Sequence, residues 1–112
     1  MGLFARTGGI DAGSAAERLA GGSVVVVDVR EPAEWRTGHI HGAVNVPLTQ
    51  LASRLHQLPS GKTIVTVCRS GHRSAVAARL LRRAGYEVEN LKGGVGSWAR
   101  AGLPLSGPRR RA

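Results

Sequence analysis

The sequence predicts an α/β protein with a mostly parallel β-sheet flanked by helices on both faces. Two runs of β-branched residues, at residues 24–27 and Thr63–Val67, are too short for helices and are typical of strands buried on both faces. Segments with apolar residues at helical spacing separate the strand-like runs. Because strands and helices alternate, right-handed crossovers would place the strands parallel to one another.

The expected elements follow one another along most of the chain. The first helix, residues 10–20, can be capped by Asp11 or Ser14 and ended by Gly21 and Gly22. Proline and glycine residues mark the ends of the later elements. After this helix, strands are expected at residues 24–29, 43–46, 63–67 and 87–91, and helices at residues 32–36, 48–58, 74–84 and 95–101.

The length of 112 residues predicts one domain, which we place at residues 8–105. Residues 106–112 form a basic tail rich in arginine that we expect to be disordered. The single cysteine excludes an internal disulfide and a cysteine-cluster metal site, which favours a reducing compartment and a cytoplasmic location. The longest apolar run is too short to cross a bilayer, so we expect no membrane partner.

The formal net charge is +9, and a strongly basic domain can attract the phosphates of nucleic acids. The arginines are nevertheless spread along the chain, and three of them lie in the tail. Phe4 and Tyr86 are isolated aromatic residues, so the sequence offers no interleaved platform for stacking bases. We therefore expect small anionic substrates and no nucleic-acid partner.

The only cysteine, Cys68, stands directly after an expected strand and just before an expected helix. Amides in such a loop and in the first helical turn lack intrahelical partners, and the helix N-terminus attracts anions. Arg69 and Arg73 add positive charge, so the thiolate should be favoured and the pKa of Cys68 lowered. The sequence thus predicts a nucleophilic Cys68 in an anion-binding loop, although a buried structural cysteine is the alternative. The expected loop residues are Arg69, Ser70, Gly71, His72 and Arg73, with Ser74 supporting them at the start of the helix.

Four motifs occur in one order along the chain: Asp28-Val29-Arg30-Glu31, residues 38–47, the cysteine loop, and Gly93-Gly94 followed by Trp98. Together they resemble a single-domain rhodanese, a sulfurtransferase module. The resemblance covers residues 10–104 and implies a rhodanese-like α/β fold. It also implies that Cys68 accepts sulfane sulfur from a donor such as thiosulfate and carries it as a persulfide to a thiol, a protein or, in assays, cyanide.

Within this resemblance, the loop amides would donate hydrogen bonds to the sulfur while Arg69 or Arg73 pairs with the sulfite part of thiosulfate. Four residues separate Cys68 from Arg73, whereas the related Cdc25-type phosphatases and arsenate reductases have one more residue. The short loop favours sulfur transfer over phosphate or arsenate chemistry. A non-enzymatic binding or regulatory module is a further alternative, disfavoured because such modules often lack the cysteine.

The resemblance also places Asp28 and Arg30 near the mouth of the site as supporting residues, where Asp28 can pair with a loop arginine. Their alternative is a strand end with solvated charges. His39 and His41 could suggest a metal pair, but no acidic or cysteine ligand clusters with them in the sequence. We expect a structural role for both, with neither metal nor cofactor. His72 lies in the loop and either adds charge when protonated or points to solvent.

Overall fold

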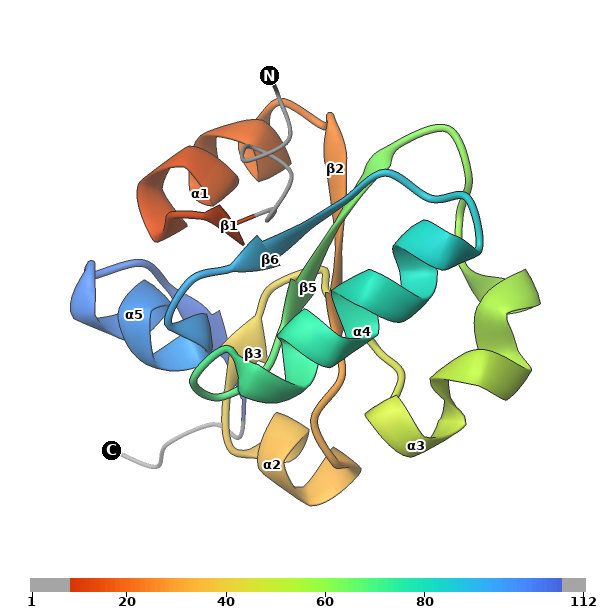
Figure 1. Cartoon of the computed structure of the whole chain (residues 1–112). Coiled ribbons are helices and arrows are strands. Elements are labelled where there is room, and N and C mark those ends of the chain that lie inside the picture. The colour runs from red at the N-terminus through yellow and green to blue at the C-terminus, as the bar shows by residue number, and fades with distance from the viewer. Residues whose placement is uncertain (1–8, 108–112) are drawn as a thin grey trace.

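The structure is a computed structural model that describes residues 9–107, and its centre is a five-stranded parallel sheet (Figure 1). A separate small sheet pairs two further strands antiparallel. The predicted α/β class with a mostly parallel sheet is therefore confirmed. The order across the large sheet is β1 (Gly9–Ile10), β6 (Val88–Leu91), β5 (Thr63–Val67), β2 (Val24–Asp28) and β4 (Val44–Asn45), and the small sheet joins β3 (His39–Ile40) to β7 (Leu105–Ser106).

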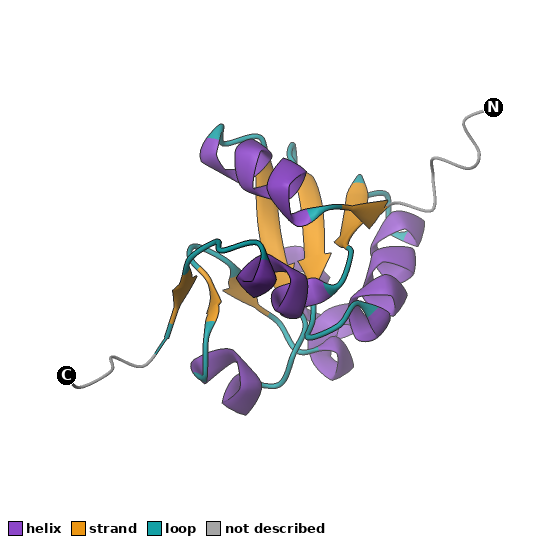
Figure 2. Cartoon of the chain, turned by 90° about the vertical axis from the view of Figure 1, so that its left-hand side faces the viewer, coloured by secondary structure: helices purple, strands orange, loops and turns teal. Residues whose placement is uncertain are grey.

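Helices cover both faces of the large sheet (Figure 2). One face packs against α1 (Ala12–Ala20) and α5 (Gly94–Arg100), and the other against α3 (Leu48–Leu51) and α4 (His72–Arg83). The short helix α2 (Pro32–Arg36) lies beyond the carboxyl end of β2, at the bottom of Figure 1. No helix within residues 9–107 is long and apolar enough to cross a membrane.

The two central strands are apolar on both faces because each side of the sheet is covered. In β2, Val26 packs into the core beside α1 and α5, whereas Val27 packs into the core beside α4. In β5, Val65 likewise packs into the core beside α1 and α5, and Ile64 packs into the core beside α4. Because alternate side chains enter apolar cores on opposite faces, residues 24–27 of β2 are apolar at every position and show no alternation of apolar and polar residues.

Several boundaries differ from the predicted ones for local reasons. The first helix begins at Ala12 rather than at residue 10, because the Asp11 carboxylate accepts the Ser14 amide at 2.8 Å and caps it. The helix expected at residues 48–58 divides into α3 and the 3-10 helix η2 (Ala52–Gln57), with Arg54 at non-helical backbone angles. Ser106, placed in the tail from the sequence, belongs to β7, and the tail from residue 108 onward lies outside the described residues.

Candidate active site

Cys68 lies at the carboxyl edge of the sheet, immediately after β5. The neighbouring strand β2 ends at the same edge, where the Val29 amide donates to the Val67 carbonyl at 2.9 Å. Ligands of open α/β sheets bind beyond this edge. The Cys68 residue itself is only 1% exposed, so its sulfur sits below the rim of the loop rather than on the surface.

The Cys68 sulfur accepts hydrogen bonds from the first turn of α4. The Gly71 amide donates to Sγ at 3.1 Å, and Ser74 donates through both its amide at 3.4 Å and its hydroxyl at 3.3 Å. Gly71 is the N-cap of α4 and has no side chain to accept the free amides of that turn. The Cys68 sulfur accepts these amides in place of a capping side chain, and a negatively charged sulfur accepts them more strongly than a neutral thiol does.

These contacts explain the acidity of the thiol. Burial raises the pKa of Cys68, but the hydrogen bond from the Ser74 hydroxyl and those from backbone amides outweigh burial and leave the pKa below its ordinary value. The predicted direction is therefore confirmed. The predicted contribution of the loop amides is confirmed, whereas the Ser74 hydroxyl, and not Arg69 or Arg73, is the side chain that lowers this pKa.

The N-terminus of α5 holds the other side of the cysteine loop. The Val95 amide donates to the Cys68 carbonyl at 2.8 Å, and the Gly96 amide donates to the Arg69 carbonyl at 3.2 Å. Gly94 makes this close approach possible, because a Cβ there would overlap the Cys68 carbonyl oxygen and stand 2.6 Å from the Arg69 carbonyl oxygen. Gly94 also has a φ of +59°, which favours glycine. The sequence motif Gly93-Gly94 thus positions the cysteine.

Arg73 is engaged by a carboxylate that the sequence reasoning did not identify. Its two terminal nitrogens contact the two carboxylate oxygens of Glu34 in α2 at 2.7 and 2.9 Å. The hydrogen bond from Arg73 lowers the pKa of Glu34 to about 2, and Glu34 in turn raises the pKa of Arg73. Arg73 was predicted as a clamp on the substrate, whereas the structure places its guanidinium on a neighbouring side chain. The only sequence signal for Glu34 was an acidic residue in the first turn of a short helix.

Asp28 and Arg30 form a buried ion pair with each other. The Arg30 Nη2 atom lies 2.8 Å from the Asp28 carboxylate and also 2.8 Å from the Gly38 carbonyl oxygen. The expectation that Asp28 would pair with a loop arginine is wrong, because Arg30 is only two residues away and folds back onto it. The pair ties the end of β2 to the turn before β3.

The remaining predicted loop residues lie at the surface. Arg69, Ser70 and His72 are exposed, whereas Ser74 is buried against the sulfur. Beside Arg69, a cavity of about 520 Å³ opens between α2 and α5. We call it the α2–α5 cavity, and its lining includes Arg30, Glu34, Thr37, Arg69, Val95 and Ala99. The cavity thus lies beside the cysteine loop, and Arg69, the residue that follows Cys68, lines it.

The two histidines of residues 38–47 make local contacts. His39 stacks on Trp35 with ring centroids 3.4 Å apart, and its Nδ1 lies 2.8 Å from the Trp35 carbonyl oxygen. His41 contacts the Ser106 hydroxyl at 3.0 Å across the small sheet. Within residues 9–107, no group of three or more His, Cys, Asp or Glu side chains is arranged to hold a metal ion.

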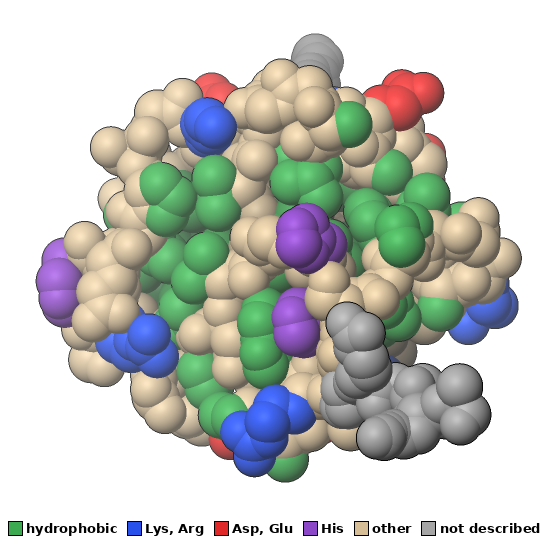
Figure 3. Space-filling view, turned by 180° about the vertical axis from the view of Figure 1, so that it is seen from behind, with side chains coloured by type: hydrophobic (Ala, Val, Ile, Leu, Met, Phe, Trp, Pro, Cys, Tyr) green, Lys and Arg blue, Asp and Glu red, His purple; other side chains and the backbone are tan. Residues whose placement is uncertain are grey.

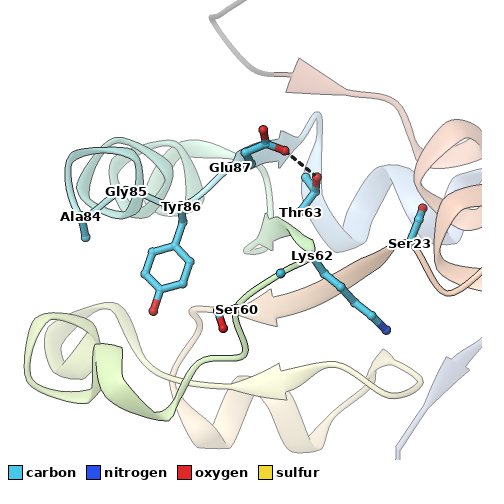
Figure 4. Close-up of a pocket in the computed structure, with 9 residues that line it drawn as sticks. Ser23, Ser60, Lys62, Thr63, Ala84, Gly85, Tyr86 and Glu87 are labelled. Atoms are coloured by element: carbon cyan, nitrogen blue, oxygen red, sulfur yellow. Dashed lines mark hydrogen bonds between the residues drawn. The ribbon is translucent and has the colours of Figure 1, made fainter.

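A second cavity, of about 550 Å³, lies at the opposite edge of the sheet, where β5 and β6 begin (Figure 4). The ammonium end of Lys62 extends away from the Glu87 carboxylate, which instead accepts a hydrogen bond from Thr63 at 3.4 Å. The groups there do not converge on a common point. The α2–α5 cavity is consequently the better candidate for substrate binding.

The face opposite to the view of Figure 1 carries separated cationic groups. Lysine and arginine side chains on this face are scattered, with apolar and neutral surface between them (Figure 3). A nucleic-acid footprint would instead be a continuous basic stripe. The high net charge is thus not concentrated on this face.

The fold and the loop define an α/β protein with an acidic thiol at the carboxyl edge of a parallel sheet. Residues 11–101 match the family described as Rhodanese-like domain, so the chain belongs to the rhodanese-like family. A protein named "Sulfurtransferase" from Allochromatium vinosum is 42% identical over 101 residues, which cover 88% of this chain and 94% of that protein.

Two further relatives show the same domain in different settings. The crystal structure of a rhodanese-related protein from Thermoplasma volcanium superposes with a TM-score of 0.83 at 32% identity, covering 88% of this chain and 96% of that one. The protein named "HTH-type transcriptional regulator Rv0324" from Mycobacterium tuberculosis is 42% identical over 79% of this chain, which spans 40% of its length. Similar domains thus occur both alone and within longer proteins.

Proposed function

We propose that this protein is a sulfurtransferase that carries sulfane sulfur on Cys68 as a persulfide. The observation that carries the proposal is the set of donors around the sulfur, two from Ser74 and one from Gly71. Such donors stabilise a thiolate before the reaction and a negatively charged persulfide after it. The name of the Allochromatium vinosum relative supports the same activity.

In the first half-reaction, the Cys68 thiolate attacks the outer sulfur of a donor such as thiosulfate. A new S–S bond forms to Cys68, the S–S bond of thiosulfate breaks, and sulfite leaves with the bonding electron pair. Arg69 is the exposed cation beside the loop and is suited to bind the sulfonate oxygens as sulfite departs. The Gly71 and Ser74 amides already contact the Cys68 sulfur, so we expect the transferred sulfur to be bound by amides of the same loop.

In the second half-reaction, a nucleophilic acceptor attacks the terminal sulfur of the persulfide, and the Cys68 thiolate leaves. A thiol of a small molecule or of a protein would serve in the cell, and cyanide would serve in an assay. The hydrogen bonds from Ser74 favour this step because they stabilise the departing thiolate. The cycle requires neither a metal nor an external oxidant.

Phosphatase or arsenate reductase activity is the weaker candidate. In phosphate or arsenate chemistry the loop must enclose the whole tetrahedral group that is attacked, whereas thiosulfate offers a single outer sulfur atom, which suits the short loop between Cys68 and Arg73. A non-enzymatic binding role is disfavoured by the lowered pKa of Cys68, which a purely structural cysteine does not need.

Intact mass spectrometry before and after exposure to thiosulfate tests the proposal. We expect Cys68 to gain the mass of one sulfur atom, cyanide to discharge it as thiocyanate, and a Cys68→Ser variant to gain nothing. A reductant control should remove the adduct. If no sulfane-sulfur donor modifies Cys68 although the thiol alkylates readily near neutral pH, the proposal is wrong and the binding-module alternative gains.

A further inference from the structure

Three charged side chains line the α2–α5 cavity, and two of them are held in ion pairs. Arg30 is paired with Asp28, and Glu34 is paired with Arg73. Arg69 is exposed and forms no ion pair in the part of the chain that the structure describes. The cavity therefore presents less positive charge to a ligand than its arginines alone would suggest.

A further cation borders this cavity without lining it. The Arg100 guanidinium lies beside Gly96, with Nη1 3.3 Å from the position of a Cβ on that glycine. A second guanidinium therefore lies close to Gly96, which lines the cavity. Arg73, in contrast, is paired with Glu34 in the only ion pair that it forms within residues 9–107.

Glu34 occupies both terminal nitrogens of Arg73, at 2.7 and 2.9 Å. Arg73 directly precedes Ser74, whose amide donates to the Cys68 sulfur at 3.4 Å, and the Cys68 thiolate contributes to raising the pKa of the Arg73 guanidinium. Without Glu34, this guanidinium would be an unpaired cation at the cysteine loop. The carboxylate thus reduces the positive potential where the substrate must bind.

We propose that Glu34 is a positioning residue that sets the charge preference of the site: by neutralising Arg73, it favours sulfur donors with one negative charge over donors with two. The inference rests on the proposed sulfur-transfer function and specifies its substrate class. Persulfides of small uncharged thiols carry one charge, whereas thiosulfate carries two. Thiosulfate would still react, but less efficiently than the site could allow.

Transfer of sulfur from a persulfide donor to Cys68 requires no co-reactant. The Cys68 thiolate attacks the outer sulfur of the donor, the S–S bond of the donor breaks, and its inner sulfur leaves as a thiolate with the electron pair. One negative charge enters the site and one leaves it. With thiosulfate, sulfite leaves as a dianion and needs more positive charge nearby. The number of free guanidinium groups therefore affects the two donors differently.

The test measures the second-order rate constant for loading Cys68 with thiosulfate and with 2-hydroxyethyl persulfide, by intact mass in single turnovers. The donor ratio is the thiosulfate constant divided by the persulfide constant. Glu34→Gln should raise this ratio about 3- to 10-fold, because Arg73 becomes a free cation in a partly exposed site. Glutamine keeps the cap on α2, since its side-chain oxygen can still accept the Glu31 amide.

Opposite signs in the two single variants separate this role from a structural one. Arg73→Met should lower the donor ratio by a similar factor, because it leaves the Glu34 carboxylate unpaired, and the double variant should return to within about twofold of the wild type. Raising the salt concentration should shrink both effects. Glu17→Gln removes the same charge from the exposed face of α1 and should leave the ratio unchanged.

Loss of loading with both donors in both single variants would overturn the inference, because a merely structural ion pair predicts that result. An unchanged donor ratio in Glu34→Gln would overturn it as well. Should Glu34→Gln fail to fold, an unchanged ratio in Arg73→Met would overturn it in the same way. If the wild-type protein is loaded by neither donor, the inference is wrong, and the proposed function falls with it when no other sulfane-sulfur donor loads Cys68. If both donors load it but the ratio is unaffected by the variants, only the inference is wrong.

Discussion

Two groups of Ser74 contact the Cys68 sulfur, the hydroxyl at 3.3 Å and the amide at 3.4 Å. The residue is buried, so water cannot replace either contact when it is lost. Its hydroxyl is the strongest of the groups that lower the pKa of the thiol against the effect of burial. Ser74, expected from the sequence to support the loop, thus contributes directly to the acidity of Cys68.

Ser74→Ala should raise the pKa of Cys68, because one donor to the thiolate is lost while burial remains. At pH 7 less thiolate is then present, so alkylation by iodoacetamide should slow about three- to tenfold, and the pH–rate curve should move to higher pH. Ser53→Ala is the control, since its hydroxyl donates to the Gln50 carbonyl in another part of the fold. An unshifted pH–rate curve in Ser74→Ala would show that the backbone amides alone set the acidity.

Two helices act as the structural supports of the cysteine loop. The N-terminus of α5 binds the carbonyl groups of Cys68 and Arg69, and α2 holds Arg73 through Glu34. Each support comes from a different part of the chain, yet both meet the same short loop. The loop is thus fixed by contacts outside itself, which keeps its amides aimed at the sulfur.

Gly94→Ala should damage the active site more than its effect on stability alone would suggest. The new Cβ would overlap the Cys68 carbonyl oxygen, so the loop or α5 must move, at a cost of about 2 kcal/mol or more. Sulfur loading of Cys68 should fall at least about tenfold. Gly102→Ala is a matched control, because Gly102 also has a positive φ, of +78°, but open space around it.

The control should lose about 1 kcal/mol from backbone strain and keep its rate of sulfur loading. Chemical denaturation measures the free energy of unfolding, and intact mass in single turnovers measures the loading. Equal loading rates for the two glycine variants would mean that the approach of α5 does not position the cysteine.

The elements that were predicted well are those with a continuous local signal. Strand β5 and helix α2 have the predicted bounds, because prolines, glycines and uninterrupted patterns delimit them. Strands β3 and β7 were missed, since two residues each give no periodicity, and they pair only through tertiary contact. The Arg73–Glu34 pair joins residues 39 apart in sequence, so no local pattern could indicate that Arg73 was already engaged.

At the scale of the whole molecule, one sheet divides the interior into two apolar clusters. Cys68 and Leu81 belong to the cluster on the α4 face, and Trp98 belongs to the cluster on the α1 and α5 face. The central strands contribute alternate residues to both clusters, so neither face can lose its packing without disturbing strands that the other face uses. We expect the two apolar clusters to lose their packing in a single unfolding transition.

Leu81→Ala tests this cooperativity from the face opposite to Trp98. Leu81 is fully buried, so the cavity should lower the free energy of unfolding by about 2–4 kcal/mol, whereas Val76→Ala, at a position 44% exposed on the same helix, should cost about 0.5 kcal/mol or less. In a Trp35→Phe background, Trp98 fluorescence and far-UV circular dichroism should report one coincident transition for the Leu81 variant. If Trp98 kept the parent midpoint while the dichroism shifted, the faces would unfold separately. Coincident fluorescence and dichroism transitions would mean that the two faces unfold as one unit. Packing on either face would then also stabilise the fold that holds the Cys68 loop.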